Sequence, residues 1–372
     1  MLHGYHAKPN RDCPLIMVAH TKTASHNNTR LIGNRLWLLP GIFALGIILI
    51  ACIVWSITLG AADIDTSIVF DAIIQSNNMD NLQLDSKIRF QYLVIQTVRF
   101  PRVMVGIMVG MALAVAGAIM QGLTRNPLAD SGILGINAGA SFAVVVAIYL
   151  IGTPSLSTYA VFAFVGAGLS ALIVYLLGSM GRGGMTPLRL TLAGVILTAF
   201  VSSFTTAILI NDEQALDKIR FWTAGSLAGR DMPILLQFAP YVVVALIGAM
   251  LISRQITTIS LGDDVAKGLG QNTLWVKMVA AVIVVMLSGA SVALAGPVGF
   301  VGLVIPHIAR FIAGADYRWI IPYSALLGGV LVTVADVGAR VIIRPQEVPV
   351  GVMMALVGAP FFIFLARARV KR

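Results

Sequence analysis

Long apolar runs, uninterrupted by Asp, Glu, Lys or Arg, make up most of this chain. A helix needs about 20 such residues to cross the hydrocarbon layer of a membrane, which is about 30 Å thick. Because the runs are continuous and do not alternate with polar positions, they exclude an outer-membrane β-barrel. The pattern therefore predicts an all-α, polytopic membrane protein. The longest uncharged runs are residues 36–62, 132–181, 190–211, 232–253 and 278–309.

Breaks at glycine, proline and charged positions divide these runs into about ten transmembrane helices. The turn signal Gly152-Thr-Pro-Ser155 splits the longest run, and Gly296-Pro-Val-Gly299 predicts a bend between a full span and a short one. A single bent helix there would leave nine spans, with the two termini on opposite sides. The predicted spans are 36–60, 92–123, 132–151, 158–180, 187–210, 232–253, 274–295, 300–313, 319–342 and 349–366.

The distribution of charge favours ten spans over nine. Lys and Arg concentrate in the cytoplasmic segments of membrane proteins, and here both ends of the chain are basic, at 8–35 and 367–372. An even number of spans keeps both ends in the cytoplasm. The net charge of +10 is therefore a sign of topology and does not indicate nucleic-acid binding.

We expect two parts in the chain: a polar cytoplasmic tail at 1–35 and one transmembrane domain at 36–372. The tail lacks the apolar core of a cleavable signal peptide. Its four histidines are irregularly spaced, and the two cysteines form no disulfide or zinc pattern, so no metal site is predicted. The connections at 61–91 and 212–231 are predicted to be mainly solvated outer loops. Inside the second span, Gly106 and Gly110 predict close helix packing, with a hinge as the alternative.

Three arginines break the expected charge bias at the outer side. Arg99 and Arg102 flank Pro101, a residue that suits the first turn of a helix, at the outer start of the second span. Arg340 lies near the outer end of the ninth span, four residues after Asp336, which is the offset of an intrahelical ion pair. The arginines either reach lipid headgroups or pair internally, or they form a positive rim for an acidic partner.

Two cytoplasmic segments are candidates for contact and gating. In Leu261-Gly-Asp-Asp-Val-Ala-Lys-Gly-Leu-Gly270, two acids at the start and glycines at both ends predict a short amphipathic helix. Such a helix suits contact with a soluble partner, although many ordinary loops share the pattern. In Arg125-Asn-Pro-Leu-Ala-Asp130, Asn-Pro ends the second span and Asn126 places a polar group at the inner mouth. An ordinary turn is the alternative there.

The chain lacks the residue patterns of an enzyme or of an ion-coupled transporter. No G-x-x-x-x-G-K-[ST] sequence is present, so no P-loop binds ATP. The spans carry no chain of acids and histidines for proton relay, and no nucleophile with its base. An ion-coupled secondary transporter remains the rival class, and a structural membrane subunit without a path of its own is a further rival.

Together, these motifs resemble the FecCD family of permeases, which serve ABC importers of iron-siderophore complexes, haem and cobalamin. The resemblance covers about residues 40–366. It is carried by Arg99-Phe-Pro-Arg102, Gly117-Ala-Ile-Met-Gln121, Arg125-Asn-Pro-Leu-Ala129, Phe221-Trp-Thr-Ala-Gly-Ser226, Leu261-Gly262 to Leu269-Gly270, Gly299 to His307, Gly314-Ala-Asp316, Ala335-Asp336, Ala339-Arg340 and Gly358-Ala-Pro360.

The resemblance implies a type II ABC importer permease in a bacterial inner membrane, paired with a second permease, two ATPase subunits and an extracytoplasmic binding protein. It implies no cofactor in this chain, with ATP and Mg²⁺ on the ATPase. The implied binding-protein docking residues are Arg99, Arg102 and Arg340. The implied ATPase-coupling residues are Leu261, Gly262, Asp263, Asp264, Ala266, Gly268, Leu269 and Gly270, and the implied gates are Asn126, Leu128, Pro187 and Leu188.

The wording of three segments is most similar to ferric-siderophore permeases of the enterobactin type. These segments are 124–130, 137–141 and 221–226. The resemblance therefore implies an iron-siderophore complex as the cargo, with haem or cobalamin as the alternatives.

Overall fold

The computed structural model describes residues 37–59, 86–152, 155–180, 186–212, 216, 219–220, 222–343 and 346–370, and every regular element in these segments is helical. The predicted tail at 1–35 lies outside the described residues. The elements are α2 (Leu38–Thr58), α4 (Ser86–Val94), a π-helical turn (Ile95–Arg99), α5 (Phe100–Thr124), a 3₁₀ helix (Ser131–Leu134), α6 (Ile136–Ile151), α7 (Leu156–Ser179), α8 (Pro187–Asn211), α10 (Met232–Leu251), α11 (Ser253–Leu261), α12 (Asp263–Gly268), α13 (Thr273–Ala295), α14 (Val301–Ala313), α15 (Tyr317–Val341) and α16 (Val350–Val370).

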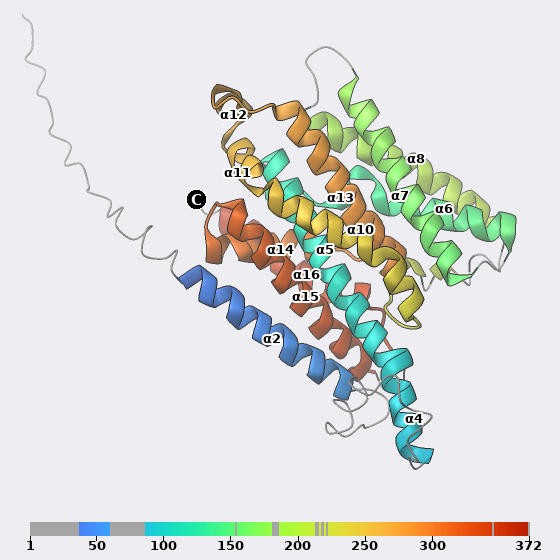
Figure 1. The fold of residues 1–372 in the computed structure, drawn as a ribbon. Coiled ribbons are helices and arrows are strands. Elements are labelled where there is room, and N and C mark those ends of the chain that lie inside the picture. The colour runs from blue at the N-terminus through green and yellow to red at the C-terminus, as the bar shows by residue number, and fades with distance from the viewer. Residues whose placement is uncertain are drawn as a thin grey trace, which may run out of the picture.

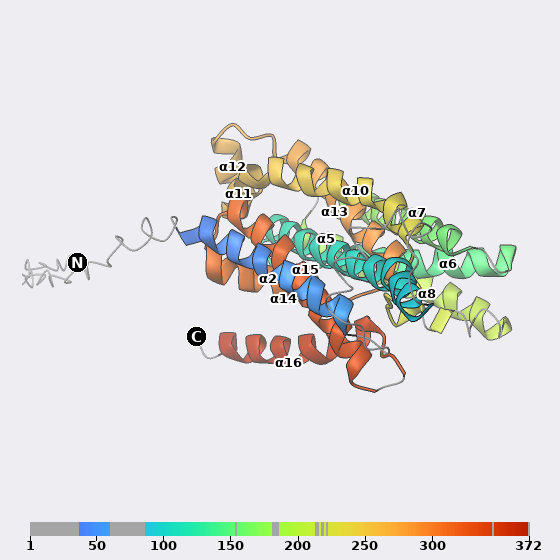
Figure 2. The same cartoon turned by 60° about the horizontal axis from the view of Figure 1, so that its bottom comes forward.

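Ten apolar helices occupy the ten predicted spans, which confirms the all-α membrane fold. Seven are long and apolar enough to cross a membrane, and three are shorter. α13 and α14 are separate helices, as the glycine-rich bend predicts. The start of α2 and the end of α16 lie at the end of the molecule that carries α11 and α12, and α4 lies at the opposite end (Figure 1, Figure 2). We name these the inner and outer ends, following the predicted topology.

α5 is the buried centre of the bundle and packs against α13, α14 and α15 (Figure 1). Small residues on α5 let neighbouring backbones approach closely. A Cβ atom on Gly110 would collide with the backbone of Gly328 in α15, and one on Gly117 with the backbone of Gly302 in α14. The prediction of tight packing is therefore confirmed at Gly110.

Pro101 lies in the first turn of α5, as predicted, but this turn does not begin a new helix. α4 runs through the π-helical turn into α5, so helix precedes Pro101 for more than three turns. Proline lacks an N–H group, and its ring clashes with the carbonyl four residues earlier in a regular α-helix. The wider π turn directly before Pro101 accommodates this irregularity. α4 is polar and lacks an apolar stripe, which is why the sequence predicts a loop there.

The prediction of a solvated connection at 212–231 is wrong for its described second half. The Ser226 N–H donates to the Ala295 carbonyl at 2.7 Å, and the Gly351 N–H donates to the Gly225 carbonyl at 3.1 Å. The segment is therefore held between the end of α13 and the start of α16. Its buried residues are Ile219, Trp222, Leu227 and Arg230.

Candidate partner surfaces and gates

Two arginines of the outer end close the last turn of α2. Arg340 Nη1 donates to the carbonyl oxygens of Ser56 and Leu59 at 2.9 and 2.8 Å. Arg99 Nη1 donates to the carbonyl oxygen of Ile57 at 2.6 Å. The last carbonyls of a helix have no partner within the helix, and they carry the negative end of its dipole. These two cations therefore satisfy groups that would otherwise be costly to bury.

Arg102 and Arg340 share one carboxylate. Arg102 contacts both oxygens of Asp336, with Nη2 to Oδ1 at 2.9 Å, and its Nη1 donates to Glu347 Oε2 at 2.7 Å. Arg340 Nη2 lies 3.2 Å from Asp336 Oδ2, so the predicted intrahelical ion pair is confirmed. We call Arg99, Arg102, Asp336 and Arg340 the arginine cluster. It joins α2, α5 and α15, with Glu347 added from the segment before α16.

The arginine cluster is buried. Arg99, Arg102 and Arg340 are 5%, 8% and 7% exposed, whereas the Glu347 side chain is 38% exposed. The internal pairing that the sequence left open is thus present, and Glu347 is the member that reaches the surface. Docking of an acidic partner remains a prediction. The charge bias pointed to the arginines, but no sequence pattern pointed to Ser56 or Glu347.

The coupling segment, residues 261–270, contains the predicted short helix. α12 spans Asp263–Gly268, with both acids in its first turn, and the flanking Gly262 and Gly270 have φ of +136° and +79°. Only Ala266 of the segment is buried. Apolar side chains at three positions spaced by four project outward at the inner end: Leu261, Val265 and Leu269, which are 67%, 48% and 70% exposed.

Asp263 connects the coupling segment to two other helices. Its Oδ2 accepts a hydrogen bond from Lys277 Nζ of α13 at 2.6 Å. Its Oδ1 lies 3.9 Å from Arg125 Nη2, beyond hydrogen-bond distance. Arg125 ends α5 with φ of +52°, a left-handed conformation that turns the chain toward the first predicted gate. Asp264, by contrast, is exposed.

The two predicted gates lie at the inner ends of α5 and α8. Asn126 Oδ1 accepts from the Leu128 N–H at 3.0 Å, so the asparagine shapes the turn itself, and Leu128 is exposed. Leu188 is exposed in the first turn of α8, which begins at Pro187; the side chain of Pro187 lies outside the described residues. The 3₁₀ helix that follows the first gate packs on α8.

The described residues contain no group of three His, Cys, Asp or Glu side chains placed to hold a metal ion. Inner polar contacts instead connect helices. Gln121 Nε2 donates to the Gly302 carbonyl at 2.9 Å, and Arg310 donates to Gln121 Oε1. These contacts link α5 to α14 on the inner side of the close approach between Gly117 and Gly302, and they were not predicted from the sequence.

Comparison with known proteins identifies the family. Residues 48–368 match the FecCD transport family. The iron(3+)-hydroxamate import system permease FhuB of Bacillus subtilis is 46% identical, over 84% of this chain and 79% of its own. The ferric enterobactin permease FepD of Escherichia coli is 39% identical, over 89% and 95%.

A haem-related protein and a solved structure are also similar. The hemin permease HmuU of Yersinia pestis is 39% identical, over 72% of this chain and 81% of its own. The structure, an inward-facing metal-chelate type ABC transporter, is 27% identical with a TM-score of 0.75 and covers 88% of this chain and 98% of that one. With the family match covering most of its length, this chain belongs to the FecCD transport family.

Proposed function

We propose that this chain forms the translocation path for an iron-siderophore complex in the inner membrane of a bacterium, with both termini in the cytoplasm. As a FecCD family member it is a permease subunit of an ABC importer and not an enzyme. In this proposal the chain carries no cofactor, and ATP and Mg²⁺ are bound by separate ATPase chains. The observation that carries the proposal is the similarity, over most of the chain, to permeases named for ferric chelates.

The coupling segment supports contact with an ATPase at the inner end. Its three outward apolar side chains are exposed within and on both sides of the short helix α12: Leu261 precedes it, Val265 lies in it and Leu269 follows it. An exposed apolar patch of this kind is typical of a protein interface. ATP-driven movement of the segment would shift the balance between outward-open and inward-open states through Asp263 and the gates.

Docking of an extracytoplasmic binding protein is proposed at the arginine cluster. Because Arg99, Arg102 and Arg340 are buried, an acidic partner has to compete with the internal acceptors. Glu347 is the acceptor most open to such exchange, since its side chain is partly exposed. Charge complementarity of this kind favours rapid and specific encounter.

A second permease, either an identical copy or a related chain, is proposed to pack beside α8. Only 11% of the most apolar 18-residue stretch of α8 is buried within this chain. Its exposed face carries large apolar side chains and also hydroxyl groups, at Ser202, Ser203 and Thr206. A face of this mixed character suits a shared axial path with Leu128 and Leu188 at its inner mouth.

Haem is the second candidate cargo, because the hemin permease of Yersinia pestis is also similar over most of this chain. Proteoliposomes that hold the permease, its ATPase and its binding protein would be offered a ferric hydroxamate, a ferric catecholate, hemin and cobalamin. We expect ATP-dependent uptake of a ferric siderophore. Uptake of hemin or cobalamin alone would reassign the cargo, and uptake driven by an ion gradient without the ATPase would refute the importer function.

A further inference from the structure

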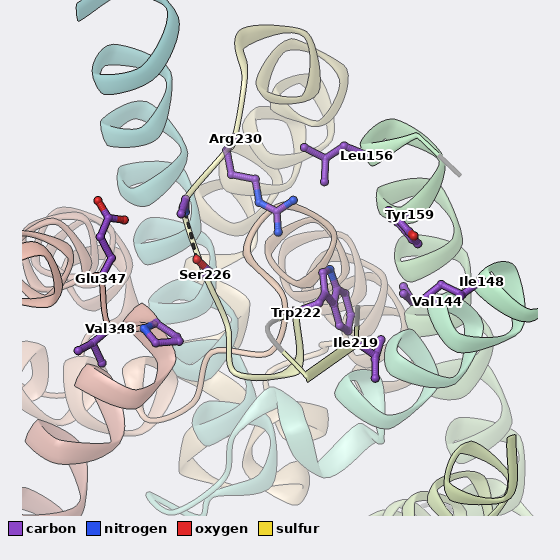
Figure 3. A pocket seen from close by; sticks show the side chains of 12 residues that line it. Val144, Ile148, Leu156, Tyr159, Ile219, Trp222, Ser226, Arg230, Glu347 and Val348 are labelled. Carbon is purple, nitrogen blue, oxygen red and sulfur yellow. Dashed lines mark hydrogen bonds between the residues drawn. The ribbon is translucent and has the colours of Figure 1, made fainter. Parts of the chain in front are cut away.

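A pocket of about 510 Å³ opens at the outer end of the bundle (Figure 3). Its walls come from the end of α6, the start of α7, the described residues between Ile219 and Arg230, and the residues before α16. Most of the lining is apolar or aromatic, including Val144, Ile148, Leu156 and Tyr159. A volume of this size lies in the range of small-molecule sites.

One buried cation in this pocket, Arg230, has no hydrogen bond or ion pair among the described residues, although the charge of Asp231 acts on it electrostatically. Arg230 is 6% exposed, and no described residue forms a hydrogen bond or ion pair with its guanidinium; its Nε is fully buried and unsatisfied. The neighbouring Asp231 caps α10 instead, because its Oδ1 accepts from the Ile234 N–H at 3.2 Å. Burial lowers the pKa of Arg230 to about 10, so the side chain remains charged at neutral pH. Burying a charge without an ion pair or hydrogen bond destabilises the folded protein, and a bound ligand of opposite charge would remove that cost.

A second unsatisfied donor belongs to a residue that lines the same pocket. Trp222 is 9% exposed, and its indole N–H has no acceptor among the described residues. Figure 3 shows the Arg230 guanidinium directed toward the Trp222 indole, with Leu156 and Tyr159 on the facing wall. The one acid of the lining, Glu347, is bonded to Arg102 at 2.7 Å. The pocket thus offers two donors and an apolar wall.

We propose that this outer pocket binds an organic oxyanion with an apolar or aromatic body, in which Arg230 pairs with the oxyanion and Trp222 supplies a hydrogen bond and a stacking surface. Resting on the proposed function, the inference assigns this anion to one arm of the imported chelate. Charge-assisted hydrogen bonds from guanidinium to an oxyanion are among the strongest in proteins. The site would favour acidic chelates over neutral ones as they enter the path.

Benzoate and benzamide make a matched pair of probes, because they share size and ring but differ in charge. Binding to the purified complex would be followed by Trp fluorescence, with Trp222→Phe identifying the responding residue. We expect benzoate to bind and benzamide to bind at least about tenfold more weakly, the ratio that corresponds to about 1.4 kcal/mol. Arg230→Gln should lose this preference, and Arg230→Lys should retain part of it. Equal binding of both probes, or an unchanged preference in Arg230→Gln, would overturn the proposal.

Two controls distinguish loss of the anion site from misfolding and from lipid binding. The elution volume and melting temperature of Arg230→Gln show whether the variant is folded, and Arg230→Lys keeps the question answerable if it is not. A lipid phosphate shares the oxyanion chemistry, so benzoate binding is measured in nanodiscs of phosphatidylcholine with and without phosphatidylglycerol. Loss of binding with phosphatidylglycerol would assign the pocket to a lipid headgroup and overturn the role in chelate binding.

The cargo experiment and the pocket experiment fail independently. If no ferric chelate is transported but benzoate still binds through Arg230, the proposed function fails and the anion site stands. If ferric siderophores are transported, and Arg230→Gln shows the same preference between acidic and neutral chelates as the wild type, the anion site is refuted and the importer function stands.

Discussion

At the scale of single residues, Asp336 connects α5 and α15 at the outer end, because its buried carboxylate forms ion pairs with both Arg102 and Arg340. Each arginine also has other acceptors, but these are uncharged backbone carbonyls and the Ser56 hydroxyl for Arg340, and the partly exposed Glu347 for Arg102. Removing one partner of a buried ion pair leaves an uncompensated charge. Asp336 should therefore contribute much more to the free energy of unfolding than Glu347 does.

Asp336→Asn should lower the free energy of unfolding by about 3–5 kcal/mol, because two buried guanidiniums lose their shared charge. Glu347→Gln should lower it by about 0–1 kcal/mol, since its ion pair reaches solvent. Thermal unfolding of the detergent-purified proteins compares the two. Equal melting temperatures would contradict the assignment of Asp336 as the central acid.

Gly117→Ala should destabilise the bundle by about 1–3 kcal/mol, because the new methyl group would overlap the backbone of Gly302. Gly46→Ala is the matched control in α2, where a Cβ atom meets nothing within 4 Å. It should be neutral or stabilising by up to about 1 kcal/mol. Melting temperatures of the two variants, measured side by side, test whether close helix approach or glycine content matters.

At the scale of elements, the coupling segment is tied to the bundle by an ion pair and by one small apolar cluster, in which Ala266 packs with Ile259 and Val276. The Asp263–Lys277 ion pair connects α12 to α13, and Ala266 is the one buried side chain of α12 itself. A segment attached in this way is able to move as a unit without disturbing the apolar core.

Asp263→Asn should uncouple ATP hydrolysis from uptake, because α12 loses its ion pair with α13 and its electrostatic attraction to Arg125. We expect uptake per ATP hydrolysed to fall several-fold while the complex stays assembled. Asp264→Asn, one residue away on the exposed side, should retain near-normal coupling. Uptake per ATP hydrolysed is measured for both variants in the same kind of proteoliposome. A normal value in Asp263→Asn would exclude a role of the Asp263–Lys277 ion pair in coupling.

At the scale of the whole molecule, α2 and α8 are the least buried of the seven long apolar helices. In each, 11% of the most apolar 18-residue stretch is buried within the chain. Their exposed faces differ in chemistry. The outer half of α8 exposes hydroxyl groups beside its apolar residues, whereas the exposed residues of α2 around Ile50 are apolar. We infer that α2 contacts lipid and that α8 borders the path.

Cysteine labelling tests this difference. In a background of Cys13→Ser and Cys52→Ser, Thr206→Cys should react with a charged, membrane-impermeant maleimide at least about tenfold faster than Ile50→Cys. The reactive thiolate forms in water and is suppressed in apolar surroundings. Similar rates at both positions would place α8 in lipid.

The sequence predicted the ten helices because each lies in a long apolar run with few or no charged residues, a signal that depends only on local composition. It also located the arginines, since cations at the outer end break a strong bias. The pair of Arg340 with Asp336 could be predicted, because the two residues are four positions apart. The acceptors of Arg340 at the end of α2 could not, because the carbonyls of Ser56 and Leu59 lie more than 280 positions away. Trp222 belongs to a motif that carries the family resemblance, but its burial was not predicted, because isolated apolar residues in a polar connection show no periodicity.

The capping of α2 by later arginines has a consequence for biogenesis. Ribosomes add about 5–20 residues per second, and Arg340 follows Ser56 by 284 positions. α2 is therefore synthesised on the order of tens of seconds before the arginine that caps it. A nascent chain released before α15 would keep those carbonyls open at the membrane surface, a defect by which quality-control proteases could distinguish an unfinished chain from a complete one.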